Sequence, residues 1–360
     1  MTPVELSRTV LRAVRRAVDG GELDVDVPAR VRVGPPGPGG CGDYATGIAL
    51  QLARPAGQPP YRVAEVLRAH LAAADGIADV VLTEPGFLNI SLHRTAPAEL
   101  VAEVLRRGPR YGHVDPKDGE RRLVQLHCDH HPRALVVADA AARILRSQGS
   151  LARISCGGPI PVEWGAVLGV RVDTGTPASE GPSVQVRPVP APGDPLPLGR
   201  DAGRWALLHP AAHDRPRIGD EHLVQRESNP LFRVRYAHAR TRALARNAAD
   251  LGFAAEPGHV EDANGNENGI DGTNNNGIYA LLGDHPRVLA AAAAHHAPDR
   301  LARHLVTVAD AVLPFLPTVL PRGGEKPSAA HRARLALAEA AGTVLAGGLT
   351  LLGIDAPDHL

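Results

Sequence analysis

Hydrophobic residues recur at helical spacing toward the carboxyl end of the chain. The clearest series, with steps of four and three residues, is Leu301, Leu305, Val308, Val312 and Phe315. Such steps place side chains on one face of a helix, where they can pack against a neighbour. We predict helices over residues 234–249, 286–294, 298–320 and 329–352. Residues 201–360 are therefore expected to form an all-α helix bundle.

The amino-terminal residues 1–115 show a mixed pattern and are expected to form a small α+β domain. The predicted elements are an opening helix through Val18, a strand over 31–33, helices over 44–52 and 61–71, and alternation over 80–92. The pattern over residues 116–200 predicts a reduced α/β region, with a strand over 123–126 and a helix over 134–146. Five prolines between residues 188 and 198 fix φ and remove amide donors, so a Pro/Gly-rich linker is expected there.

Composition narrows the function only a little. The 39 basic and 39 acidic residues cancel, so nucleic-acid binding would have to depend on local patches. Cys41, Cys128 and Cys156 form no Cys-x-x-Cys pair and leave an odd number, which argues against a disulfide framework or a structural zinc site. A reducing cytoplasm is the expected setting. No apolar run is expected to span a membrane.

Three polar segments imitate ligand sites. Residues 37–42 satisfy Gly-x-Gly-x-x-Gly, but they lie among prolines without a longer strand–helix–strand context, so no dinucleotide site is expected. Residues 261–277 place asparagines like a calcium loop, yet Asn275 stands where a bidentate Glu is needed. We expect a flexible, solvated loop.

The cluster His127, Asp129, His130 and His131 contains zinc-ligand side chains, but adjacent side chains rarely converge on one ion. Neither a metal nor a cofactor is expected.

Three segments near the amino terminus form a recognisable series: residues 42–53 (GDYATGIALQLA), Pro59 before a helix with Ala64-Glu65, and residues 85–89 (PGFLN). In order and spacing they resemble the N-terminal additional domain of arginyl-tRNA synthetases. That domain approaches the tRNA elbow, and the resemblance implies elbow contacts by Phe87, Asn89 and Tyr44. Alternate strand residues share a face, where a ring could stack on a base and an amide could read its edge. Alternatively, Phe87 belongs to the core and Asn89 to a turn. The family usually has Asn at Gly47.

The carboxyl-terminal third resembles the DALR-type anticodon-binding domain of the same family. The matching segments are residues 229–230 (NP), 234–240 (VRYAHAR), 301–303 (LAR), 334–337 (RLAL) and 348–357 (GLTLLGIDAP). The resemblance implies contact with the tRNA anticodon arm. The candidate residues are Arg235, Tyr236, His238, Arg240 and Arg242. On a helix, Arg235, His238, Arg242 and Arg246 share one basic face, with Tyr236 and Arg240 beside it. Such a face could hold phosphates and stack bases, or it could be a solvated arginine stripe.

The middle of the chain departs from this class I synthetase family. Residues 131–139 (HPRALVVAD) resemble the segment that starts at the second histidine of the His-x-Gly-His motif, but Cys128, Asp129 and His130 precede His131. Residues 200–208 resemble the segment after the Lys-Met-Ser-Lys-Ser loop, so only residues 154–199 remain for most of the catalytic fold. Adenylation needs donors and positive charge around the triphosphate. We therefore expect a degenerate nucleotide motif and no catalytic residue.

These observations predict a non-catalytic relative of arginyl-tRNA synthetase that binds tRNA, of the arginine type, and does not bind a membrane. A full-length synthetase is a possible protein partner. Three alternatives remain. The chain could be an arginine–tRNA ligase component that is active only with a partner, it could have acquired new chemistry at residues 127–131, or it could be a protein-interaction scaffold.

Overall fold

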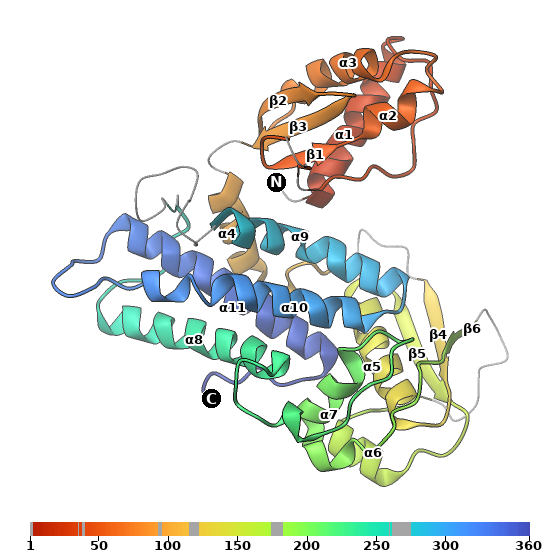
Figure 1. Cartoon of the computed structure of the whole chain (residues 1–360), viewed down its shortest axis with the longest axis vertical. Coiled ribbons are helices and arrows are strands. Elements are labelled where there is room, and N and C mark those ends of the chain that lie inside the picture. Colours follow the sequence, from red (N-terminus) through yellow and green to blue (C-terminus); the bar gives the residue numbers. More distant parts are fainter. Residues whose placement is uncertain are drawn as a thin grey trace. The chain divides into compact units, whose positions relative to one another are not determined.

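The computed structural model describes residues 3–34, 36–37, 40–92, 96–114, 122–173, 183–258, 260 and 275–360. The chain divides into two compact units, Met1–Leu100 and Val101–Leu360. Figure 1 shows both units with their elements labelled. Helix α4 (Ala96–Arg107) runs across the division. The division into three domains predicted from the sequence stays a prediction.

The first unit is a three-stranded antiparallel sheet packed with helices. Its strands are β1 (Tyr44–Thr46), β2 (Ile77–Thr83) and β3 (Phe87–Leu92), in the order β1-β3-β2. Its helices are α1 (Pro3–Asp19), α2 (Ile48–Ala53) and α3 (Pro60–Ala72). Leu88 and Ile90 of β3 are fully buried in the core that these helices share with the sheet. The α+β character expected from the sequence is therefore confirmed.

Two local predictions in this unit were wrong. Residues 31–33 form no strand. The next residue, Gly34, makes one isolated bridge, to Ala45. Tyr44 begins strand β1, while the helix that was predicted to start there begins at Ile48. Pairing of Tyr44 with Ile90 of β3 explains the change, since a ladder contact made by tertiary structure outweighs local helical periodicity.

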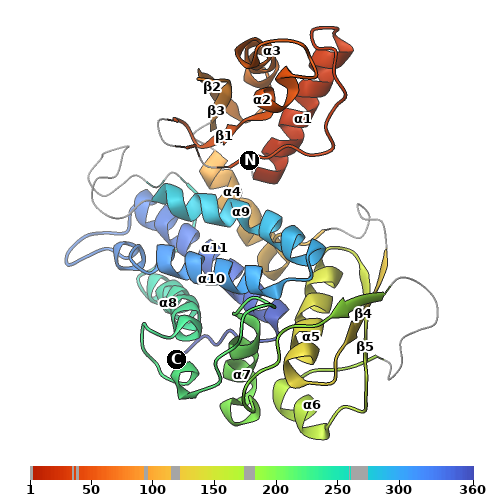
Figure 2. The ribbon, with the colours of Figure 1, turned by 45° about the vertical axis from the view of Figure 1, so that its right-hand side comes forward.

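The second unit begins with a three-stranded parallel sheet. Its strands are β4 (Leu123–Cys128), β5 (Leu151–Cys156) and β6 (Ser183–Val186), in the order β5-β4-β6. Helix α5 (Pro132–Ser147) packs on one face (Figure 2). Parallel sheets are usually apolar on both faces, whereas the other face here carries the polar residues Gln125, His127, Ser155 and Gln185. This composition suits a sheet with one helical layer, which fits the reduced α/β region.

Two further features complete this region. Asp173 lies along the outer edge of β5, where its carboxylate accepts from the amide of Ile154 at 2.9 Å and its own amide donates to the Ile154 carbonyl at 3.0 Å. Helices α6 (Val162–Leu168) and α7 (Gly199–Leu208), separated by β6 and a short 3₁₀ turn, then lead toward the bundle. No helix longer than that turn occupies residues 188–198, as the prolines predict.

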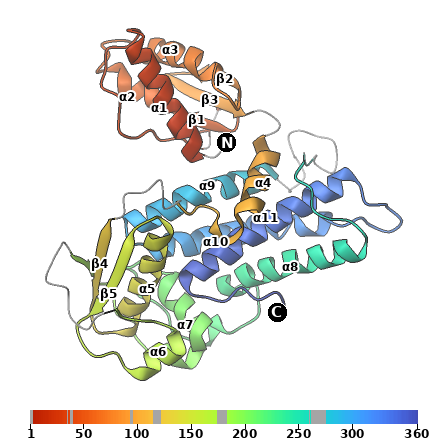
Figure 3. The ribbon, with the colours of Figure 1, turned by 180° about the vertical axis from the view of Figure 1, so that it is seen from behind.

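The rest of the unit is a bundle of helices α8 (Pro230–Asp250), α9 (Asn275–Ala294), α10 (Pro298–Val312) and α11 (Ala329–Leu352). Helix α11 packs against α8, α9 and α10, which Figure 3 shows from behind. Helix α9 starts eleven residues before the predicted Pro286, because Ile278, Leu282 and Leu289 are buried along one face of it. Residues 261–274 of the predicted Asn/Gly-rich loop lie outside the described residues, as do Pro38 and Gly39 of the Gly-rich segment.

Helix α11 forms the centre of the bundle. It begins with a capping box between Ser328 and His331 and ends in a left-handed Gly353. Its length and apolar composition would allow it to cross a membrane, contrary to our expectation for this chain, but 78% of its apolar window is buried inside the structure. A core helix passes the same test. Gly348 lets the Leu305 side chain approach the helix backbone closely.

A fully buried arginine joins the sheet region to the bundle. Arg204 of α7 donates to the carboxylate of Asp139 at 2.6 Å and to the Leu168 carbonyl at 2.9 Å. Its Nε donates to the Leu352 carbonyl, at the end of α11, at 2.7 Å. Hydrogen bonds from a charged donor in a buried site are worth more than neutral ones. Arg204 thereby fixes α5, α6, α7 and α11 in one compact unit.

Candidate nucleic-acid interface

The carboxyl edge of the parallel sheet, where β4, β5 and β6 end, carries the predicted degenerate nucleotide motif. Cys128 is buried beside its neighbour in register, Cys156. Burial raises the pKa of the Cys128 thiol to about 12, and the adjacent Cys156 adds to the increase. The thiol therefore stays protonated at neutral pH, and a protonated thiol is a poor nucleophile and a poor metal ligand.

The three residues after Cys128 bond to nearby parts of the chain. The Asp129 carboxylate lies 3.6 Å from Arg187, and the His130 ring bonds the Pro159 carbonyl at 2.7 Å and packs against Trp164. His131 caps α5 by accepting from the Ala134 amide at 3.2 Å. Within the described part of the chain, no group of three or more His, Cys, Asp or Glu side chains is placed to hold a metal ion.

Arg133, which sequence reasoning passed over, occupies the first turn of α5. It is fully buried and donates to five backbone carbonyls, those of Val189, Asp214, Ala211, Leu207 and Pro210, at 2.6 to 3.2 Å. A positive charge beside a helix start could hold phosphate. Here the guanidinium holds the segment 189–214 against the sheet instead.

In the first unit, the three predicted elbow residues differ in exposure. Phe87 is 40% exposed, whereas Asn89 is 2% and Tyr44 is 7% exposed. The Asn89 amide donates to Thr83 Oγ1 at 2.9 Å and to the Val81 carbonyl at 3.3 Å. A Cβ at Gly47 would lie 3.2 Å from the Phe87 ring, so this glycine leaves room for the ring. Phe87 faces solvent, and Asn89 and Tyr44 pack within the fold.

Helix α8 presents an aromatic and basic surface, which we call the aromatic–arginine face: Phe232, Tyr236 and Arg240. These residues are spaced by four, so they follow one another along one side of the helix. The rings of Phe232 and Tyr236 stack, with centroids 5.4 Å apart and planes 17° apart. Tyr236 is 38% exposed, and Arg240 is exposed and makes no side-chain hydrogen bond or ion pair to any described residue.

The other predicted basic residues of α8 lie on a second face, which the chain itself covers. Arg235 lies 3.6 Å from Asp201. His238 is buried and bonds the Pro357 carbonyl at 3.1 Å, and burial lowers its pKa. Arg242 and Arg246 both contact Asp358. The open basic face predicted from helical spacing is thus wrong for His238, because the carboxyl-terminal tail, residues 353–360, packs over this side of α8.

A cavity of about 340 Å³ lies beside the aromatic–arginine face. Its walls include Phe232, Leu223 and Val224, with the Arg235 and Asp201 pair on another side. The Arg235 Nε is buried and has no hydrogen-bond partner. The rest of the lining is mixed, with Leu198, Leu231 and Leu360 beside the polar residues Arg200, His222, Gln225, Asn229 and Asp355. Apolar walls that also carry donors and acceptors suit a planar ring with polar edges, such as an unpaired nucleobase. No sequence pattern pointed to Asp201, because it lies in α7 and is distant from α8 along the chain.

Two family models match the chain. The Arginyl tRNA synthetase N terminal domain matches residues 5–92, and the DALR anticodon binding domain matches residues 234–360. Two similar relatives are the arginine–tRNA ligases of Frankia alni, 41% identical over 157 residues, and Renibacterium salmoninarum, 41% identical over 162 residues. The matched segments cover 41% and 42% of this chain but only 28% and 29% of those relatives.

Solved structures agree on the architecture. The arginyl-tRNA synthetase of Thermus thermophilus has a TM-score of 0.68 at 14% identity, with 100% of both chains covered. That of Plasmodium falciparum has a TM-score of 0.65 at 8% identity, with 99% of both chains covered. The fold is that of an aminoacyl-tRNA synthetase. Together with the family models, this shows that the chain carries the N-terminal and DALR domains of arginyl-tRNA synthetases around a truncated catalytic region.

Proposed function

We propose that this chain is a non-catalytic, arginyl-tRNA synthetase-like protein of the cytoplasm that binds tRNA of the arginine type. The aromatic–arginine face of α8 would receive the anticodon arm, and Phe87 would contact the elbow. Asn89 and Tyr44 would support Phe87 from within the fold, and Arg235 would line the cavity beside the aromatic–arginine face.

The observation that carries the proposal is the exposure of Tyr236 and Arg240 beside a cavity. A ring with one free side can stack on a base, and an arginine without an internal partner can bind a phosphate. Both residues lie on one side of α8 together with Phe232, and Phe232 also lines the 340 Å³ cavity that contains the unpartnered Arg235 Nε. A helix surface that only stabilised the fold would not need an exposed aromatic ring and an arginine without an internal partner on the same side.

The bonding at the carboxyl edge of the sheet supports the non-catalytic part of the proposal. A nucleotide site needs free donors there. In this chain His130, His131 and Arg133 bond their own backbone, and Asp129 adds a negative charge beside them. A triphosphate would have to break these contacts before it could bind.

The proposal is tested by binding total tRNA to the purified chain and sequencing the retained fraction. We expect arginine tRNAs to be enriched. A Tyr236→Ala/Arg240→Gln variant should bind about tenfold to a hundredfold more weakly, through loss of one stacked base and one phosphate contact. Arg300→Gln is the matched control, because Arg300 is exposed on α10 and its side chain makes no hydrogen bond or ion pair within the described residues.

Binding without tRNA enrichment, or binding that Tyr236→Ala/Arg240→Gln leaves unchanged, would contradict the proposal and favour a protein-interaction scaffold. Aminoacylation of tRNA by the chain, alone or mixed with a full-length synthetase that carries an inactivated catalytic site, would contradict the non-catalytic part alone.

A further inference from the structure

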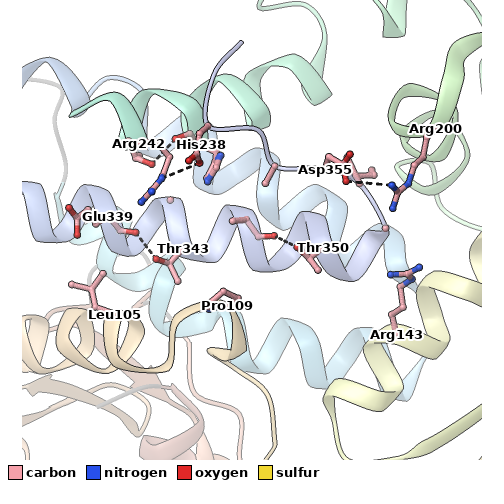
Figure 4. A pocket seen from close by; sticks show the side chains of 17 residues that line it. Leu105, Pro109, Arg143, Arg200, His238, Arg242, Glu339, Thr343, Thr350 and Asp355 are labelled. Carbon is pink, nitrogen blue, oxygen red and sulfur yellow. Dashed lines mark hydrogen bonds and ion pairs between the residues drawn. The ribbon is translucent and has the colours of Figure 1, made fainter. Parts of the chain in front are cut away.

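A larger cavity, of about 520 Å³, lies over α11 on the tail-covered side of α8 (Figure 4). Three arginines from three different helices line it: Arg143 of α5, Arg200 of α7 and Arg242 of α8. The hydroxyl groups of Thr343 and Thr350 also face it, and each donates to the carbonyl four residues earlier on α11. The hydroxyl oxygens therefore remain able to accept. We call this the arginine cavity.

Each of these arginines uses only part of its hydrogen-bonding capacity. Arg143 donates through Nε to Asp139 at 2.9 Å, and Arg242 donates through Nε to Asp358 at 3.1 Å. Arg200 is paired with Asp355 only at 3.6 Å, beyond hydrogen-bond length. Among the described residues, the terminal nitrogens of Arg143 and Arg242 have no hydrogen-bond partner. Three guanidinium groups thus surround one space with donors to spare.

The acidic groups that face the cavity belong mostly to the tail. Asp355 and Asp358 are both more than half exposed in their side chains. Exposed ion pairs contribute little to stability, so these two carboxylates can leave at low cost. The third acid, Glu339 of α11, is partly buried. The negative charge that neutralises Arg200 and Arg242 is therefore on a segment that a competing anion can replace.

We propose that the arginine cavity is a second site for RNA backbone phosphates, and that Asp355 and Asp358 hold its arginines until phosphates displace them. Guanidinium groups bind phosphate through paired donors, which makes arginine suited to this role. Arg242 is two residues beyond Arg240 on α8 and therefore points to the opposite, tail-covered side of the helix. The inference rests on the proposed tRNA binding and adds to it a site on that side, which borders the 340 Å³ cavity at Arg200 and Asp355.

The test measures tRNA affinity of the full chain at salt concentrations from about 50 to about 200 mM. An Arg143→Gln/Arg200→Gln variant removes two cavity donors without touching α8. Because Arg200 also lines the 340 Å³ cavity, Arg143→Gln alone, at a residue that lines only the arginine cavity, is measured beside it. The affinity of the double variant should fall about tenfold, and the slope of log affinity against log salt should become shallower by about two. An Asp355→Asn/Asp358→Asn variant should bind about threefold more tightly, because the tRNA phosphates no longer compete with carboxylates. Since Asp355 also lines the 340 Å³ cavity, Asp358→Asn alone should show the same direction of change.

Matched controls exclude a general effect of charge. Arg300→Gln and Asp250→Asn remove an exposed charge of each sign away from the cavity, and neither should change affinity. Circular dichroism and the unfolding midpoint of every variant establish that the fold is intact. If Arg143→Gln/Arg200→Gln unfolds, the asparagine variant alone still tests the inference, because it keeps every arginine.

The inference and the proposed function fail in different ways. If wild-type tRNA binding depends on Tyr236 and Arg240 but neither cavity variant changes it, the arginine cavity is overturned and the proposed function stands. If the chain binds no tRNA, both fail. Competition by inorganic pyrophosphate separates the sources of phosphate. Tight pyrophosphate binding that Arg143→Gln/Arg200→Gln abolishes, with tRNA affinity unchanged, would overturn the RNA site in favour of a small phosphate ligand.

Discussion

The carboxyl edge of the parallel sheet and the aromatic–arginine face of α8 both retain residues that resemble family motifs, but they differ in what those residues contact. At the sheet edge, His130, His131 and Arg133 bond the chain's own backbone. On α8, Tyr236 and Arg240 face solvent. The presence of a motif residue at its expected position is therefore weak support for a binding site, unless its hydrogen-bond donors remain available to a ligand.

The largest effect should come from Arg133, where this difference is most pronounced. We expect Arg133→Met to lower the free energy of unfolding by about 3 kcal/mol or more, because five carbonyls lose a charged donor. Chemical denaturation measures the change. The exposed Arg300→Met should stay within about 0.5 kcal/mol of the wild type. Equal stability of the two variants would mean that Arg133 is not a structural residue and would remove the contrast with α8.

Low pH should lower the stability of the fold through a second set of buried groups, a pair of histidines. The rings of His285 on α9 and His304 on α10 stack with centroids 5.3 Å apart, and the Tyr111 ring also stacks on His285, at 6.0 Å. Burial lowers the pKa of His285 well below its usual value and that of His304 to about 4. The charged groups that face them are His113, Asp284 and Arg287. Both histidines are therefore neutral in the folded chain at neutral pH.

The direction of the pH effect follows from these pKa values. Between the unfolded pKa of about 6.5 and the folded values, the unfolded chain binds protons that the folded chain does not, so stability falls as pH falls. His304 alone accounts for roughly 3 kcal/mol between about pH 6.5 and 4. Unfolding midpoints across this range measure it. His304→Leu should flatten the dependence, whereas the exposed His213→Leu should not.

A single side chain on α8 gives the next effect. Tyr236→Ala should weaken tRNA binding by about 1–3 kcal/mol, the usual loss for one base stacked on an aromatic ring. Tyr236→Phe keeps the ring and should bind nearly as the wild type does. Filter binding at fixed salt distinguishes them. If Tyr236→Phe is as weak as Tyr236→Ala, the hydroxyl rather than stacking is responsible, and the physical account of this face must change.

The smallest effects divide Phe87 from Asn89 in the first unit. Phe87→Ala should lower tRNA affinity by about 1 kcal/mol with little change in stability, because the ring is exposed. Asn89→Ala should lower stability by about 1 kcal/mol, because it removes hydrogen bonds to Thr83 and Val81. Measuring both the tRNA affinity and the free energy of unfolding of each variant separates the two effects. The reverse result would place the amide, not the ring, at the elbow.

Helical periodicity predicted the four bundle helices, and residues 329–352 match α11 at both ends. The bounds of two others were wrong, since α9 starts at Asn275 before the predicted residue 286, and α10 ends at Val312 before the predicted residue 320. The local pattern predicted the wrong secondary structure where pairing with a distant strand determines it. Tyr44, for example, is in a strand because it pairs with β3. The local pattern also failed for contacts between distant segments. Helical spacing groups Arg235, His238 and Arg242, but nothing local to α8 shows that Asp201 and the tail cover them. Arg133 was missed for the same reason, since its partners lie more than fifty residues away.

The small parallel sheet illustrates how a shortened fold can avoid self-association. Unpaired strand edges invite pairing with a second molecule. Asp173 occupies both the amide and the carbonyl of Ile154 on the outer edge of β5. Beyond β6, Pro188, Pro190 and Pro192 cannot donate to a further strand. At the outer edge of β5, therefore, one residue of the chain occupies a pairing position that a second molecule would otherwise use.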